Sequence, residues 1–110
     1  MRLTEQDNGA EITVRKAEEI IIALPENPTT GYRWSVEASG DALALDSADY
    51  APATTAVGAG GKRTMRFIAQ RPGTSTIHAQ LRRSWEDPKA AINAYTVTIA
   101  VTGIDHGNDR

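Results

Sequence analysis

Apolar residues recur at every second position along most of this chain, and this spacing places them on one face of a β-strand. Tyr95, Val97 and Ile99, for example, alternate with Thr96 and Thr98. A nearly continuous β-branched run at residues 19–24 predicts a strand that is buried on both faces. The alternation predicts further strands over residues 12–14, 32–36, 43–45, 65–69, 77–81 and 95–101.

Turn-forming residues separate these runs. Asn8-Gly9 is a dipeptide typical of hairpin turns, and Arg71-Pro72-Gly73 predicts a tight turn between two strands. Short strands at regular spacing, with such turns between them, predict an all-β fold, specifically an immunoglobulin-like antiparallel β-sandwich. This prediction depends on the rhythm of the strands, because the chain has no cysteine and so lacks the Cys…Trp…Cys pattern of antibody domains.

The length of 110 residues fits one domain of common size. We predict a single domain over residues 1–103, followed by a flexible polar tail over residues 104–110. Hydrophobic residues at 40% and charged residues at 24% are typical of a globular protein rather than a disordered one. We expect this domain to be a monomer.

Charge and residue types argue against several classes of function. The net charge is −2 and no block of like charge stands out, so we expect no nucleic-acid partner. Without cysteine there is no thiol nucleophile and no thiolate metal site, and we expect no metal and no cofactor. No apolar run approaches the ~20 residues that span a membrane, so we expect no membrane partner.

The sequence leaves two alternatives for the cellular compartment of the protein. Residues 1–9 lack the apolar stretch of a secretory signal. Either the protein is cytoplasmic, or it is periplasmic or secreted and a signal sequence has been removed before residue 1. A domain without disulfides can work in either redox setting.

Three unusual connections, at residues 27–31, 58–61 and 83–91, are the candidates for a binding surface. If successive strands run mostly antiparallel, every second connection lies at the same end of the sandwich. About two strands separate each of these connections from the next, so we expect all three loops to emerge side by side. Loops carried by a rigid sheet are common seats of function.

The three loops differ in composition in ways that suit binding. The first is stiff with a small polar tip, because Pro28 fixes φ and Thr29 and Thr30 precede Gly31. The second, Gly58-Ala59-Gly60-Gly61, is nearly bare backbone that can pair with an extended segment. The third contains the residue types most often found as interface hot spots, in the run Arg82-Arg83-Ser84-Trp85.

Each loop taken alone also has an ordinary structural interpretation. The first could be a simple turn, the second a mobile hairpin, and Trp85 a core residue. Trp34 lies on an alternating strand, and we predict that it belongs to the core. The convergence of the three loops is what favours a binding surface.

The three segments together resemble the chagasin family of cysteine peptidase inhibitors. Asn27-Pro28-Thr29-Thr30-Gly31-Tyr32 is similar to the first-loop motif of that family, and Gly58-Ala59-Gly60-Gly61 to its glycine-rich loop. Arg83-Ser84-Trp85 is similar to its third motif, in which a proline usually stands where this chain has Ser84. The resemblance spans roughly residues 9–103 in order and spacing.

This resemblance implies an immunoglobulin-like sandwich that inhibits papain-like cysteine peptidases reversibly and without a covalent bond. It implies that Thr29, Thr30 and Gly31 enter the active-site cleft near the catalytic cysteine. The glycine-rich loop would run along one side of the cleft through its backbone, and Arg83 and Trp85 would lie along the other side.

An enzyme and an adhesion or carbohydrate-binding module are the two rival functions. An enzyme is disfavoured, because the only histidines are His78 on the outer side of a strand and His106 in the tail, and no catalytic motif appears. Glu86 and Asp87 are interpreted as a solvated charge cluster. An immunoglobulin-like adhesion or carbohydrate-binding module would use the same fold. A sugar-binding face needs several exposed aromatic residues, and only 5% of this chain is aromatic.

Overall fold

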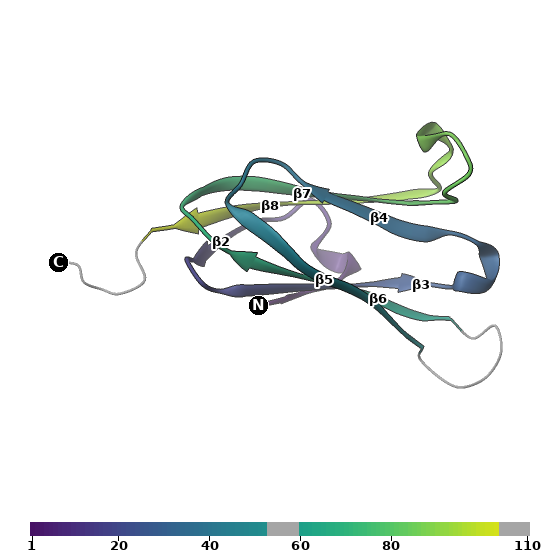
Figure 1. The fold of residues 1–110 in the computed structure, drawn as a ribbon, viewed down its shortest axis with the longest axis horizontal. Helices are drawn as coiled ribbons and strands as arrows, with labels where there is room; N and C mark the ends of the chain where they lie inside the picture. Colours follow the sequence, from purple (N-terminus) through teal and green to yellow (C-terminus); the bar gives the residue numbers. More distant parts are fainter. Residues whose placement is uncertain (53–59, 104–110) are drawn as a thin grey trace.

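The computed structural model describes residues 1–52 and 60–103, which form two four-stranded β-sheets packed face to face (Figure 1). The first sheet has the order β1-β3-β6-β5, formed by Arg2–Leu3, Glu19–Glu26, Gly61–Ala69 and Leu43–Pro52. The second sheet has the order β2-β8-β7-β4, formed by Glu11–Arg15, Asn93–Thr102, Gly73–Arg82 and Arg33–Ala38. Three short 3-10 turns lie between strands: η1 (Glu5–Asp7), η2 (Pro28–Thr30) and η3 (Pro88–Ala90).

Strand pairing gives the predicted immunoglobulin-like sandwich. Neighbouring strands run antiparallel except at one edge of each sheet, where β1 lies parallel to β3 and β2 lies parallel to β8. The chain changes sheet at every connection from β1 to β5 and again between β6 and β7, whereas β5–β6 and β7–β8 connect strands of the same sheet. The predicted polar tail at residues 104–110 lies outside the described residues.

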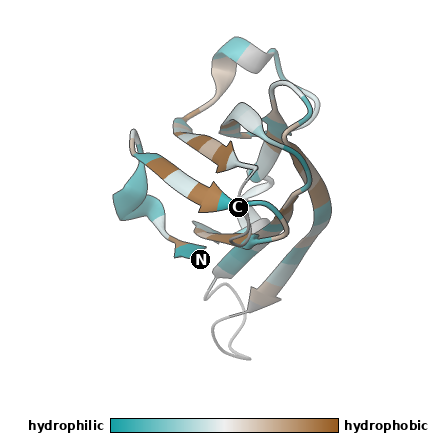
Figure 2. Cartoon of the chain, turned by 90° about the vertical axis from the view of Figure 1, so that its left-hand side faces the viewer, coloured by the Kyte–Doolittle hydropathy of each residue, from teal (hydrophilic) through white to brown (hydrophobic). Residues whose placement is uncertain are grey.

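The core lies between the sheets and is built from the alternating positions. Ile20, Ile22 and Leu24 of β3 are fully buried and face the other sheet's buried positions, which include Val97 and Ile99 of β8. Figure 2 shows the alternation as brown and paler bands along the strands. The strand predicted for residues 19–24 is confirmed, but its burial on both faces only in part: on the side opposite Ile22, Ala23 is buried whereas Glu19 and Ile21 are half-buried.

Two local predictions were wrong. Asn8-Gly9 makes no hairpin, because β1 and β2 belong to different sheets and η1 carries the chain between them. Asn8 and Gly9 instead bond to β8, where the Thr96 amide donates to Asn8 Oδ1 at 2.9 Å and the Gly9 amide donates to the Thr96 carbonyl at 2.7 Å.

The second wrong prediction concerns β5, which was predicted over residues 43–45 but is ten residues long. It is an edge strand that pairs with β6, with a β-bulge between Leu45 and Ser47. Leu43 is buried whereas Leu45 is half exposed. A polar edge strand that pairs on one side only carries no period-two signal that the sequence pattern could detect.

Candidate functional site

One end of the sandwich collects the ends of six strands. Glu26, at the end of β3, is in register with Gly61 at the start of β6, and Gly61 is in register with Pro52 at the end of β5. In the other sheet, Arg33 at the start of β4 is in register with Arg82 at the end of β7. The β3–β4 and β7–β8 connections, with η2 and η3, lie together at this end (Figure 1). The predicted convergence is confirmed for the described residues, whereas Gly58 and Ala59 lie outside them.

The first loop is closed by its own side chains. Asn27 Oδ1 accepts hydrogen bonds from the Thr29 amide at 3.1 Å and the Thr29 hydroxyl at 2.7 Å. The Thr30 hydroxyl donates to the Asn27 carbonyl at 2.8 Å and accepts from the Tyr32 amide at 3.3 Å. Asparagine and threonine side chains often stabilise turns by such local bonds. Thr29 and Thr30 are exposed at the tip, so the loop presents a rigid polar edge.

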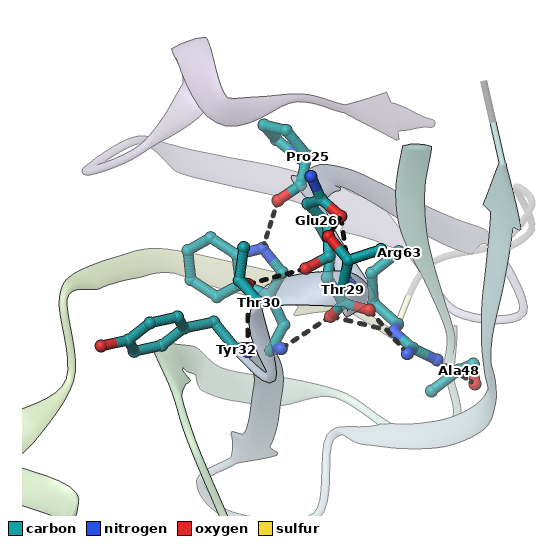
Figure 3. A network of polar contacts seen from close by, with 9 residues as sticks. Pro25, Glu26, Thr29, Thr30, Tyr32, Ala48 and Arg63 are labelled. Atoms are coloured by element: carbon teal, nitrogen blue, oxygen red, sulfur yellow. Dashed lines mark hydrogen bonds and ion pairs between the residues drawn. The ribbon is translucent and has the colours of Figure 1, made fainter. Parts of the chain in front are cut away.

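A buried carboxylate fixes the base of this loop (Figure 3). The side chain of Glu26 is fully buried, and its Oε1 accepts a hydrogen bond from the Trp34 amide at 2.8 Å. Arg63 of β6 donates through Nη2 to Oε2 at 2.7 Å and through Nε to Oε1 at 3.3 Å. The Trp34 indole donates to the Pro25 carbonyl at 2.8 Å. Glu26 therefore joins β3, β4 and β6 just below the loops.

The second loop contacts the first at Gly60. Gly60 has φ +77°, and a Cβ built there would lie 3.5 Å from both Asn27 Cβ and the Glu26 carbonyl oxygen. Glycine adopts this left-handed backbone without strain. The backbone at Gly60 therefore lies directly beside the turn that Asn27 organises.

The third loop is tied to the first by Arg83. Its Nε donates to the Thr30 carbonyl at 3.2 Å, and its guanidinium lies over the Tyr32 ring, 4.3 Å from the centroid. The same guanidinium lies 6.0 Å from the Trp85 ring centroid and 3.8 Å from Glu86 Oε2. The predicted site residue Arg83 thus holds two loops together, and Ser84 beside it is exposed.

Trp85 packs its ring edge on Gly31. A Cβ at Gly31 would lie only 2.9 Å from Trp85 Cη2, so the absence of a side chain there makes room for the indole. The residue is nevertheless 72% exposed, whereas Trp34 is 9% exposed and belongs to the core. Both tryptophan assignments made from the sequence are confirmed. An exposed indole held in place by its neighbours is a usual binding hot spot.

A pocket of about 520 Å³ opens among the three loops. Its lining includes Tyr32, Gly60 and Arg83, together with Leu81 and the 60% exposed Ile92. Ile92 escaped the sequence analysis because it stands outside the motifs and outside the alternation of β8. Its amide donates to the Leu81 carbonyl at 2.9 Å, which places it at the root of the third loop.

The supporting residues were also missed by sequence reasoning. Glu26 and Arg63 belong to no motif. The one signal in the sequence was the position of Glu26, a charged residue at the end of an apolar run. The interpretation of Glu86 and Asp87 as a solvated cluster holds for Asp87, which is exposed, but not for Glu86. Glu86 is half-buried beside Arg83, and Asp87 caps η3 by accepting from the Lys89 amide at 2.9 Å.

Within the described residues, no group of three or more His, Cys, Asp or Glu side chains is arranged to hold a metal ion. His78 is half-buried on β7, and its Nδ1 lies 3.0 Å from the Thr96 hydroxyl. No helix in the described part of the chain has the length and apolar character to cross a membrane.

Comparisons with known proteins agree with this geometry. Residues 13–99 match the sequence profile of the chagasin family peptidase inhibitor I42. Chagasin of Trypanosoma cruzi is 28% identical over 102 residues, covering 87% of this chain and 93% of chagasin. Amoebiasin-1 of Entamoeba histolytica is 34% identical over 104 residues, covering 92% of this chain and 99% of the amoebiasin.

A solved structure extends the likeness to three dimensions. The crystal structure of a cysteine protease inhibitor from Entamoeba histolytica superposes with a TM-score of 0.80 at 26% identity, covering 92% of this chain and 93% of that one. The profile match covers most of the sandwich and all three loops. This chain therefore belongs to the chagasin family of peptidase inhibitors.

Proposed function

We propose that this protein inhibits papain-like cysteine peptidases by inserting the three-loop end of the sandwich into the active-site cleft. The observation that carries the proposal is the contact chain across the loops: Asn27 against Gly60, Arg83 on Thr30, and Trp85 on Gly31. Because these loops already lie against one another before they meet a partner, little conformational entropy is lost on docking. A protease–inhibitor interface buries about 800 Å² per partner, which three adjacent loops can supply.

Each predicted site residue has a role in this proposal. Thr29, Thr30 and Gly31 form the wedge that faces the catalytic cysteine. Trp85 lies against one wall of the cleft, and the segment Gly58-Ala59-Gly60-Gly61 lies along the other wall through its backbone. The remaining site residues shape and hold these groups: Asn27, Pro28, Tyr32, Arg83 and Ser84.

Inhibition in this scheme is reversible and non-covalent, and the protein is not an enzyme. The wedge carries hydroxyl groups that are hydrogen-bonded within the loop. We infer that the loop, held in this turn, presents no peptide bond aligned for attack. Small misplacement of a reacting bond is costly for catalysis, so a tightly held loop can occupy the cleft without being cleaved.

The test is an inhibition titration against papain and a panel of cathepsins. We expect wild-type protein to inhibit, activity to return on dilution, and the chain to stay intact by mass spectrometry. Trp85→Ala should weaken binding by about 2 kcal/mol, or roughly 30-fold. Leu45→Ala is the control, because Leu45 is an exposed apolar residue on β5, away from the loops, and should leave inhibition unchanged.

Two outcomes would contradict the proposal. If no papain-like peptidase is inhibited at micromolar protein, an adhesion or carbohydrate-binding module becomes the better interpretation. If inhibition persists unchanged in Trp85→Ala, Trp85 is no contact residue and the loop arrangement needs another explanation.

A further inference from the structure

Two arginines face each other on the outer surface of the second sheet, next to the loops. Arg33 opens β4 immediately after the first loop, and Arg82 closes β7 immediately before the third loop. The two residues are direct partners in the antiparallel β4–β7 register. Their neighbours Trp34 and Leu81 point to the core side, so both arginines project from the outer face.

Neither arginine is neutralised within the described residues. The other two arginines at this end have carboxylate partners, since Arg63 bonds to Glu26 and Arg83 lies beside Glu86. No hydrogen bond or ion pair involves the side chain of Arg33 or Arg82 in the part of the chain that the structure describes.

The neighbouring register pairs of β4 and β7 carry no charge. The next register pair along the strands, Ser35 with Gln80, carries no charge, and Glu37 lies four residues beyond Arg33, or about 13 Å along β4. Like charges placed directly opposite one another destabilise a sheet. The pair therefore lowers the stability of the free protein unless an anion from outside approaches it.

The position of the pair indicates where that anion comes from. Arg33 and Arg82 line a hollow of about 130 Å³ together with Ser35 and Ser84. Ser84 is the direct neighbour of Trp85, so the hollow adjoins the proposed contact surface. A peptidase that encloses the loops would bring the rim of its cleft over this hollow.

We propose that the Arg33–Arg82 pair receives a carboxylate on the rim of the peptidase cleft and makes peptidases with acidic rims the preferred targets. This inference rests on the proposed inhibitory function. Two guanidinium groups converging on one carboxylate form charge-assisted hydrogen bonds, which are stronger than neutral ones. Charges on an interface rim act mainly on the association rate and its dependence on salt.

The experiment measures association rates by stopped flow for papain and a panel of cathepsins ordered by the number of carboxylates on the cleft rim. Wild-type protein is compared with the double variant Arg33→Gln/Arg82→Gln. Lys16→Gln/Arg15→Gln is the matched control, because it removes two charges at the β2–β3 turn, the opposite end of the sandwich. Rates are taken at about 0.01 M and about 0.15 M ionic strength, where the Debye length is about 30 Å and about 8 Å.

We expect the wild-type rate to rise with the number of rim carboxylates and the double variant to lose that dependence. The loss should be about tenfold for the most acidic rim at low salt and smaller at high salt. The melting temperature of the double variant should be equal to or above that of the wild type, because the like-charge contact is gone.

The outcomes separate the two proposals. One outcome is that the wild type inhibits while both double variants keep the wild-type dependence of the association rate on the number of rim carboxylates. In that case the Arg33–Arg82 inference is wrong and the inhibitory function stands. If the double variant melts well below the wild type, the pair has a structural role, which also overturns the inference. If the wild type inhibits no member of the panel, the inhibitory function itself fails.

Discussion

At the residue scale, two glycines with the same backbone conformation have different tasks. Gly31 has φ +82° and Gly9 has φ +87°, so both occupy the left-handed region that side chains disfavour. A Cβ on Gly9 would meet nothing within 4 Å, whereas one on Gly31 would collide with the Trp85 indole. Gly31 therefore serves both the turn and the placement of an exposed tryptophan.

Comparing Gly31→Ala with Gly9→Ala separates these tasks. Both substitutions should lower the free energy of unfolding by about 1–2 kcal/mol through backbone strain. Only Gly31→Ala should weaken peptidase inhibition and change the Trp85 fluorescence, because the new methyl group displaces the indole. Equal inhibition by the two variants would show that Trp85 does not depend on the space at Gly31.

At the element scale, polar side chains hold the strand ends that carry the loops. Glu26 and Arg63 are separated by 37 residues yet form a bidentate pair between β3 and β6. Breaking a buried pair leaves a buried charge without its partner, which is far more costly than losing an exposed pair.

Glu26→Ala and Glu5→Ala form a matched comparison, because each glutamate faces a basic residue of β6. Glu5 lies 3.8 Å from Lys62, and both of these side chains are at least half exposed. We expect Glu26→Ala to lower the free energy of unfolding by about 3–5 kcal/mol and Glu5→Ala by less than about 1 kcal/mol, measured by urea denaturation. Similar losses for the two would contradict the assignment of Glu26 as the support of the loops.

Arg83 is the connection between the first and third loops. Arg83→Lys keeps the charge but removes the flat guanidinium that covers Tyr32 and the Nε donor to Thr30. We expect inhibition to weaken by about 1–2 kcal/mol while the melting temperature stays within a few degrees. Arg71→Lys, at the exposed pair with Asp41, is the control and should change neither quantity. If Arg83→Lys inhibits as strongly as the wild type, the contacts of Arg83 with Tyr32 and Thr30 are not needed to hold the two loops together.

At the scale of the whole molecule, Tyr95 links the N-terminal segment to β8. Its hydroxyl donates to the Thr4 carbonyl at 3.0 Å. Burial, assisted by the charge of Asp7, raises the pKa of Tyr95 from 10.0 to about 12. The folded state therefore retains a proton that the unfolded chain releases above pH 10.

This difference predicts how stability changes in alkali. The contribution of Tyr95 to the free energy of unfolding is fully present below pH 10. It is lost as the pH rises from about 10 to about 12, by at most about 1.4 kcal/mol per pH unit. Tyr95→Phe should remove this part of the slope, at the cost of about 1 kcal/mol at pH 7 for the lost hydrogen bond. The free energy of unfolding is measured against pH by denaturant unfolding for both proteins. Equal slopes for the wild type and Tyr95→Phe between pH 10 and pH 12 would rule out this linkage.

The family and the inhibitor class predicted from the loops are confirmed by the comparisons, and so is the fold. Alternation along the chain was enough to assign Trp34 to the core and the loops to one end. These features are local in sequence: period two sets which face of a strand is apolar, and counting strands sets which end a loop occupies.

Only the tertiary structure decided which side chains meet between the loops. Thr30 and Arg83 are separated by 53 residues, and the hydrogen bond between them depends on how β4 and β7 align. The same register sets Arg33 opposite Arg82, and the space above Gly31 is filled by an indole from another loop. No repeat or motif encodes such contacts, because they arise from strand register and sheet packing. The sequence alone determined the alternating centres of most strands, whereas the ends of β5, β6 and β7 and the short β1 came only from the structure.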